Sequence, residues 1–143
     1  MSRLNLALLV VLSACSDELA PAFKPGEFSI QFTVASSMCS HDLVETFDRH
    51  TLGSVGMIRI TDIYPAPQGG YQLWPRVDWE SNWRLIVTIE GESTEPGVTV
   101  AICHAYELII GQLPPGGYEL ILRHSDPALS FVDTVRVTHV NVR

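Results

Sequence analysis

Basic residues are scarce in this chain, and they form no cluster. The sequence has 9 Lys and Arg against 16 Asp and Glu, which gives a formal net charge of −7. An acidic surface repels the phosphates of nucleic acids and the head groups of anionic lipids. The composition therefore argues against nucleic acid as a partner and against electrostatic binding to a membrane.

The sequence also lacks the short motifs of the common hydrolases and nucleotide-binding proteins. It has no GxSxG and no HExxH, and GSVG at 53–56 is too short for a phosphate-binding loop. Its histidines are scattered, and we interpret them as surface or sheet residues: His41, His50, His104, His124 and His139. We therefore expect a non-enzymatic protein without a cofactor. A hydrolase stays open as a weaker alternative, because the two carboxylates of a glycosidase can lie far apart in the chain.

The apolar run near the N-terminus is too short to cross a bilayer. Arg3 precedes LNLALLVVL, and the eleven residues from Leu4 to Ala14 would rise about 16 Å as a helix against a hydrocarbon core of roughly 30 Å. A basic residue followed by such a run is the layout of a secretory signal peptide. We expect residues 1–14 to be this signal.

The residues that follow this run are Leu12, Ser13, Ala14 and Cys15. They resemble the lipobox of bacterial lipoproteins. The resemblance implies cleavage before Cys15, a diacylglyceryl group on its sulfur and an acylated amino terminus, and several acyl chains give stable anchoring. The predicted location is the periplasmic side of a bacterial envelope. Ser16 in place of aspartate favours the outer membrane over the inner one.

After Cys15 the composition indicates a short tether and one globular domain. Residues 15–26 include SDELAPAFKP, which has no periodicity and two prolines, so we expect a semi-extended spacer. The hydrophobic content of 46% is ample for a core. We expect residues 27–143 to form a single domain.

Beyond Gly26 the sequence alternates between apolar and polar residues, as half-buried strands do. Turn signals, APQGG, EPG, PPGG and SDP, separate the alternating segments. The predicted strands are 27–35, 56–63, 71–77, 84–91, 98–110, 117–124 and 131–142, and 40–50 is either a turn of helix or a further short strand. Seven or eight strands without a long helix predict an all-β, antiparallel sandwich.

The stretch GQLPPGGYELILRH has a leucine, a Pro/Gly turn and a tyrosine that opens a strand. It resembles the tyrosine corner of immunoglobulin-like and fibronectin type III sandwiches, in which the tyrosine hydroxyl bonds to nearby backbone. The resemblance gives Tyr118 this structural role, with Leu113 beneath its ring. The cysteine and tryptophan spacing of true immunoglobulin domains is absent, so the resemblance concerns architecture alone.

Lipidation of Cys15 would leave Cys39 and Cys103, 64 residues apart in an oxidising compartment. We predict a disulfide between them, for which the chain-entropy model gives about 4 kcal/mol. Two free buried thiols and a metal site are the alternatives, since SMCSHD and AICHAY each place a histidine beside the cysteine. Strand neighbours point to opposite faces, so Cys103 and His104 do not readily share an ion. Asp78, Glu80 and Asn82 have calcium-loop spacing without its glycine and closing glutamate.

Three tryptophans fall within YQLWPRVDWESNWRL, so Tyr71, Trp74, Trp79 and Trp83 form a candidate partner or ligand surface. If Leu73 and Val77 face the core, Trp74 faces outward, and Trp83 adjoins a buried strand start. Pro75 marks this strand as an edge or a bulge. We expect a lipid-anchored accessory or scaffold subunit that contacts another envelope or membrane protein. The alternative is a glycan- or peptide-binding module that uses this aromatic segment.

Overall fold

The computed structural model describes residues 28–38, 46–65, 70–94 and 102–143. These ranges form eight strands and one short 3-10 helix, η1 (Pro127–Leu129). The strands are β1 (Ser29–Met38), β2 (His50–Ser54), β3 (Met57–Pro65), β4 (Tyr71–Ser81), β5 (Arg84–Ser93), β6 (Ile102–Gly111), β7 (Gly116–Asp126) and β8 (Phe131–Val142). The predicted signal and tether, with Cys15, lie outside the described residues.

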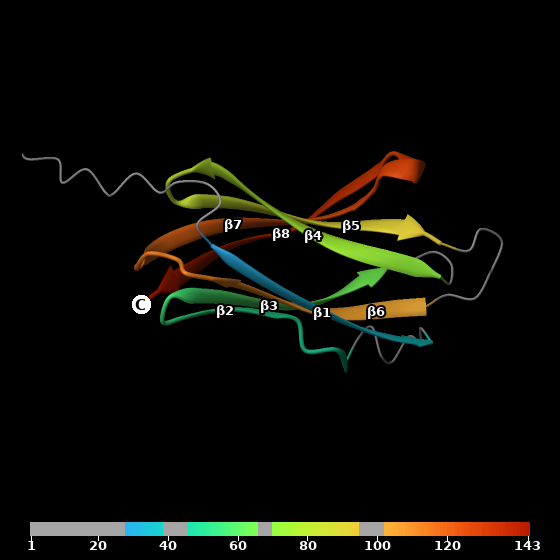
Figure 1. Ribbon diagram of the computed structural model, residues 1–143, viewed down its shortest axis with the longest axis horizontal. Coiled ribbons are helices and arrows are strands. Elements are labelled where there is room, and N and C mark those ends of the chain that lie inside the picture. Colours follow the sequence, from blue (N-terminus) through green and yellow to red (C-terminus); the bar gives the residue numbers. More distant parts are fainter. Residues whose placement is uncertain (1–27, 39–45, 66–69, 95–101) are drawn as a thin grey trace, which may run out of the picture.

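The strands form two sheets of four that lie face to face, one above the other in Figure 1. Sheet A has the order β1-β6-β3-β2, and sheet B has the order β4-β5-β7-β8. The predicted all-β sandwich is confirmed. The neighbours are antiparallel except β5 and β7, which run parallel. An immunoglobulin-like order is not confirmed, and a purely antiparallel sandwich was too simple an expectation.

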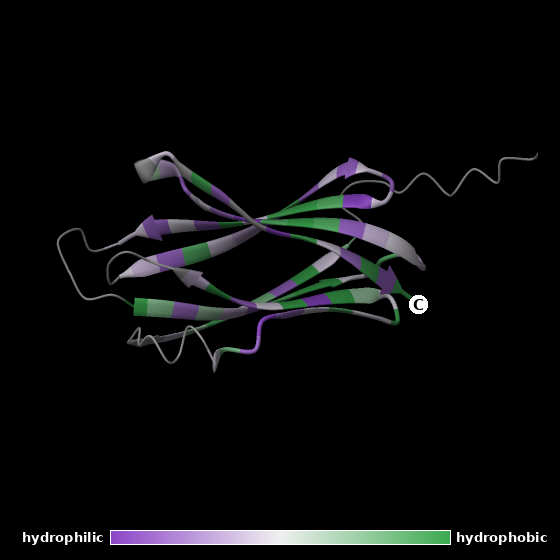
Figure 2. Cartoon of the chain, turned by 180° about the vertical axis from the view of Figure 1, so that it is seen from behind, coloured by the Kyte–Doolittle hydropathy of each residue, from purple (hydrophilic) through white to green (hydrophobic). Residues whose placement is uncertain are grey.

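Alternation along the strands builds the core, and Figure 2 shows it as bands of opposite hydropathy. On β5, Leu85, Val87 and Ile89 are fully buried, while the residues between them face the outside of sheet B. The same period places residues of every strand except the short β2 in one apolar cluster, from Ile58 on β3 to Val142 on β8. Side chains of alternate residues share a face of a strand, so this pattern fixes the register of both sheets.

The two long sides of the sandwich differ. On one side β2 and β8 meet, because the Arg143 amide donates to the Ser54 carbonyl at 3.1 Å and the Gly56 amide donates to the Arg143 carbonyl at 3.0 Å. On the other side β1 and β4 are the edge strands of their sheets, joined by an edge-to-face contact between Phe28 and Trp79 at 6.2 Å between ring centroids. Backbone hydrogen bonds therefore join the sheets on the first side, whereas on the second the described residues of the two edge strands meet through side chains.

Candidate functional site

The structure divides the predicted aromatic surface between the two faces of β4. Tyr71 and Trp79 share the inner face with Leu73, and Tyr71 is 8% exposed. Trp74 lies on the outer face and is 39% exposed. Trp83, in the β4–β5 turn, is 37% exposed. The four side chains therefore do not form one continuous platform.

Trp79 and Trp83 come together around Tyr118. The ring centroids of Trp79 and Trp83 lie 6.0 and 5.2 Å from that of Tyr118, and a Cβ on Gly116 would collide with the Trp83 ring. The Tyr118 hydroxyl donates to the Pro114 carbonyl at 2.7 Å, which is the hydrogen bond of a tyrosine corner. Leu113 is buried. These aromatic rings stabilise one end of the sandwich.

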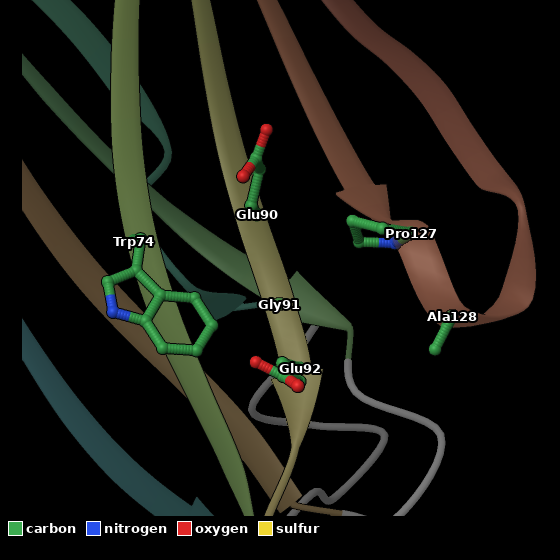
Figure 3. A pocket seen from close by; sticks show the side chains of 6 residues that line it. All are labelled: Trp74, Glu90, Gly91, Glu92, Pro127 and Ala128. Atoms are coloured by element: carbon green, nitrogen blue, oxygen red, sulfur yellow. The ribbon is translucent and has the colours of Figure 1, made fainter.

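Trp74 lines a pocket of about 370 Å³ on the outer face of sheet B. Figure 3 shows Trp74 on β4, Glu90 and Glu92 on β5, and Pro127 and Ala128 on the turn beyond. Gly91 contributes the remaining lining. The pocket thus extends from the edge strand β4 to the β7–β8 connection. Its volume is within the range of pockets that bind small ligands.

Hydrogen bonds from the interior hold the Pro127–Ala128 wall of this pocket. The Tyr71 hydroxyl donates to Asp126 Oδ2 at 2.7 Å, and Asp126 Oδ1 accepts from the Ala128 amide at 3.0 Å. The Tyr64 hydroxyl donates to the Ser125 carbonyl at 2.9 Å. Tyr71, predicted as a contact residue, therefore positions the wall from below rather than lining the pocket.

The charges of the pocket come from two glutamates that the sequence reasoning missed. Glu90 pairs with Trp74 in the β4–β5 register, and Glu92 pairs with Gln72. Glu90 Oε1 lies 3.0 Å from Arg76 Nη1, and Arg76 also binds Asp78 through Nε at 3.0 Å. No basic side chain of the described ranges lies within ion-pair distance of Glu92. Alternation alone indicates the outward direction of both glutamates, but their position beside Trp74 requires the strand pairing.

Behind the pocket, the interior at this end of the sandwich is polar. Asp62, 1% exposed, accepts from the Ile63 amide at 2.8 Å and lies 3.0 Å from Arg49 Nε and 3.4 Å from Arg136 Nη2. The inward-facing members of this polar interior are Asp62, Tyr64, His104, Tyr106, His124 and Arg136. Hydrogen bonds between Tyr106 and His124 and between Arg136 and Asp62 satisfy part of this set, which would otherwise be costly to bury. Among the described residues, His104 Nε2 and Arg136 Nε are buried without a hydrogen-bond partner.

Burial shifts the protonation of the histidines and tyrosines in this polar interior. The pKa of His124 is lowered by burial and by Arg136 and Arg49, against the opposing effects of Asp62 and Asp133. Burial also lowers the pKa of His104. Burial, aided by Asp126 and Tyr71, raises the pKa of Tyr64 to about 12. Near neutral pH these groups are uncharged, because the interior disfavours their charged forms.

The histidines of the polar interior are hydrogen-bonded rather than exposed. His124 Nε2 lies 2.9 Å from the Tyr106 hydroxyl, and His104 Nδ1 lies 2.7 Å from Ser36 Oγ. Both histidines are 3% exposed. Since solvent scarcely reaches them, we interpret the polar interior as structural.

The cysteine and metal predictions fall partly outside the described residues. Cys39 lies there, whereas Cys103 is buried on β6 on the face opposite His104. On β6, Cys103 lies opposite Ser37 in the β1–β6 register, which ends with Met38 opposite Ile102. The Cys39–Cys103 disulfide stays a prediction. Within the described ranges no three His, Cys, Asp or Glu side chains are grouped to hold a metal ion.

The acidic residues with calcium-loop spacing, at the end of β4, form ion pairs with arginines. Asp78 pairs with Arg76, and Glu80 Oε2 lies 2.9 Å from Arg84 Nε. The carboxylates that would open a calcium loop are thus engaged with arginines along the outer face of sheet B.

β1 forms an edge without charge. Its ten residues, SIQFTVASSM, contain no charged residue and no proline. Ile30 and Val34 share the inward face with Phe32, which packs on Tyr106 at 5.7 Å between centroids, yet they are 41% and 42% exposed. By contrast, the other open edge, β4, carries Pro75 and three charged residues. β1 therefore lacks the devices that normally keep an edge strand from pairing.

Comparison of the chain with protein-family models, with curated proteins and with solved structures finds no match. In the part of the chain that the structure describes, no helix has the length and apolarity needed to traverse a bilayer.

Proposed function

We propose that this chain is a lipid-anchored, non-enzymatic accessory subunit that docks on another protein of the bacterial envelope through β1. The observation that carries the proposal is the uncharged edge of β1, with Ile30 and Val34 exposed beside it. Among the described strands β1 pairs with β6 alone, so an extended segment of a partner could add as a further strand and hydrogen-bond to the backbone of its other edge. Its apolar side chains would cover Ile30 and Val34.

The chemistry of the edge favours a partner segment of alternating apolar and small polar residues. Thr33 and Gln31 point outward between Ile30, Phe32 and Val34, so an added strand would meet an apolar row on one face and hydroxyl and amide groups on the other. A different protein is a better occupant than a second copy, because the net charge of −7 opposes close approach of two identical chains.

The test of this docking is a mild-detergent purification of the full-length protein from the cells that make it, with Val34→Lys compared with wild type. A lysine on the edge introduces a charge that strand addition would have to bury. Val137→Lys is the matched control, since Val137 is 56% exposed on β8, away from β1. Val137→Lys should change the free energy of unfolding by less than about 0.5 kcal/mol, and Val34→Lys, on the inward face of β1, should lower it by about 1 kcal/mol. Circular dichroism should show that both variants are folded.

The proposal expects a stoichiometric partner with wild type and Val137→Lys, its loss with Val34→Lys, and hydrogen-exchange protection of β1 in the complex. A partner retained by Val34→Lys would place the contact elsewhere. Purification of the protein alone, or as a homodimer through β1, would contradict docking on a different protein.

The anchor forms part of the same proposal and has its own test. Cys15→Ser should leave an uncleaved precursor without lipid, and mass spectrometry of the amino terminus reads this directly. Normal processing of the variant would show that Cys15 is not the lipidated residue.

A second candidate function is a glycan- or peptide-binding module, favoured by the exposed ring of Trp74 in its pocket. Titration with cell-wall glycans followed by tryptophan fluorescence tests it, with Trp74→Leu as the variant that should abolish a saturable change. An immunoglobulin-like kinship, to which the Tyr118 hydrogen bond lends support, also stays a prediction, because immunoglobulin sheets lack the parallel pairing of β5 with β7.

A further inference from the structure

We infer that the Trp74 pocket binds a cationic group on an aliphatic stem, such as the side chain of an arginine or lysine in a peptide. The inference deepens the second candidate function by naming the chemistry of the ligand. It does not depend on docking at β1, which lies on the other sheet.

The pocket combines the two groups that recognise an organic cation. The face of an indole attracts a guanidinium or ammonium group, and Trp74 is exposed on the outer face of sheet B. Glu92, on the neighbouring strand, provides a carboxylate at the same pocket. Figure 3 shows the Glu92 side chain extending on the side of β5 that faces the Trp74 ring.

The nearby arginine does not neutralise this site. Arg76 is held by Asp78 and by Glu90, at 3.0 Å from each carboxylate. Glu90 therefore shares its charge with Arg76, while Glu92 has no basic neighbour at ion-pair distance in the described ranges. The pocket keeps a net negative charge that an incoming cation can satisfy.

The opposite wall suits the stem of such a ligand. Pro127 and Ala128 are apolar, and the Asp126 contacts to Tyr71 and to the Ala128 amide fix them in place. A wall that is already ordered lowers the entropy lost on binding. A volume of about 370 Å³ accepts one long side chain with room for its flanking backbone.

The experiment is a titration of the full chain, followed by the NMR signal of the Trp74 indole N–H, with two blocked peptides that differ in charge alone. One contains arginine and the other contains citrulline, the neutral isostere of arginine. We expect saturable shifts at millimolar peptide with arginine and at least about fivefold weaker binding with citrulline. Glu92→Gln should weaken arginine binding to a similar degree, and Trp74→Leu should weaken it further.

Glu80→Gln is the matched control, because Glu80 lies on the same face of β4 but pairs with Arg84 outside the pocket. It should leave the affinity for arginine unchanged. Equal binding of arginine and citrulline, no effect of Glu92→Gln, or no saturable binding of either peptide would each overturn the inference.

Two further probes separate this inference from the proposals above. A neutral N-acetylated glycan that saturates the Trp74 signal while arginine does not would support glycan binding and reject the cation site. A glycan with free amino groups that binds as well as arginine would identify the source of the cation as sugar rather than peptide. Val34→Lys should leave all these titrations unchanged, so loss of docking at β1 and loss of cation binding are distinguishable.

Discussion

Tyr118 shows how one residue type in one local pattern determines several contacts. Its hydroxyl bonds to the Pro114 carbonyl four residues upstream, while its ring contacts Trp79 and Trp83, from the end of β4 and the turn after it. The hydrogen bond is local, so the sequence can indicate it. The ring contacts depend on how the strands pair, so the sequence cannot.

Removal of the Tyr118 hydroxyl should have a small, measurable cost. Tyr118 is 1% exposed, so Tyr118→Phe keeps the packing and loses one hydrogen bond, which we expect to lower the free energy of unfolding by about 1 kcal/mol. Urea unfolding followed by fluorescence measures it. An unchanged midpoint would mean that the Pro114 carbonyl is equally well satisfied by water.

Trp74 and Asp62 mark the limits of prediction at the scale of single residues. Alternation with Leu73 gives the outward direction of Trp74, and the structure agrees. The same alternation places Asp62 on the inner face of β3 between Ile60 and Tyr64, where a sequence gives no reason to expect a carboxylate. Its partners, Arg49 and Arg136, lie far apart in the chain, so only the folded structure brings them to it.

Among the elements, the strands with a buried apolar face were predicted from the sequence, and β2, whose apolar residue is exposed, was not. The predicted segments correspond to β1 and to β3 through β8, although β4 extends to Ser81 and β6 begins at Ile102. β2 was not predicted in its observed position, His50–Ser54, because its apolar residue Leu52 is 54% exposed and leaves no core pattern. The sheet order was beyond prediction, since the parallel pairing of β5 with β7 joins strands separated by β6 in the other sheet.

Asp62 links elements of both sheets, and its neutralisation should be costly. Arg49 precedes β2 and Arg136 belongs to β8, so Asp62 on β3 holds the two sheets together at this point. Asp62→Asn keeps the size of the side chain but leaves two arginines without their counter-charge. We expect a loss of about 3 kcal/mol in the free energy of unfolding, at the lower end for a broken buried ion pair because both arginines are partly exposed.

Glu107→Gln is the control for Asp62→Asn, measured by the same chemical denaturation. Its carboxylate lies 3.7 Å from Arg59, with both side chains more than one third exposed, so the change should stay within about 0.5 kcal/mol. Equal effects of the two substitutions would show that Asp62 is no more than a surface ion pair.

For the molecule as a whole, the core is apolar at one end and polar at the other. The apolar end contains Ile58, Leu108, Leu120 and Val142. The opposite end contains Asp62, Tyr64, Tyr71, His104, Tyr106 and His124. The Trp74 pocket lies outside the polar end, and its wall is held by Tyr71 and Asp126 from that end. A substitution that disturbs this polar end should therefore also displace the Pro127–Ala128 wall of the pocket, because Asp126 links the two.

The polar interior should also set the pH range in which the fold is stable. His124 and His104 have lowered pKa values in the fold, whereas unfolded histidine titrates near about 6.5. Below that pH the unfolded chain binds protons that the folded chain does not, so stability should fall as the pH decreases from about 7.5 to 5.5. At the alkaline end, the pKa of Tyr64 is raised to about 12, so stability should fall as the pH rises above about 10, where unfolded tyrosine ionises.

Denaturation midpoints across this pH range test the assignment to His124. His124→Gln keeps a polar side chain beside the Tyr106 hydroxyl but cannot take up a proton, so the acid decline should become shallower even if the variant is less stable overall. His139→Gln should keep the decline of wild type, because His139 is exposed on β8. Asp62 and Asp133 oppose the lowering of the His124 pKa by burial and by the two arginines. An unaltered acid decline in His124→Gln would mean that these carboxylates hold the pKa of His124 near its unfolded value. His104 alone would then carry the pH dependence.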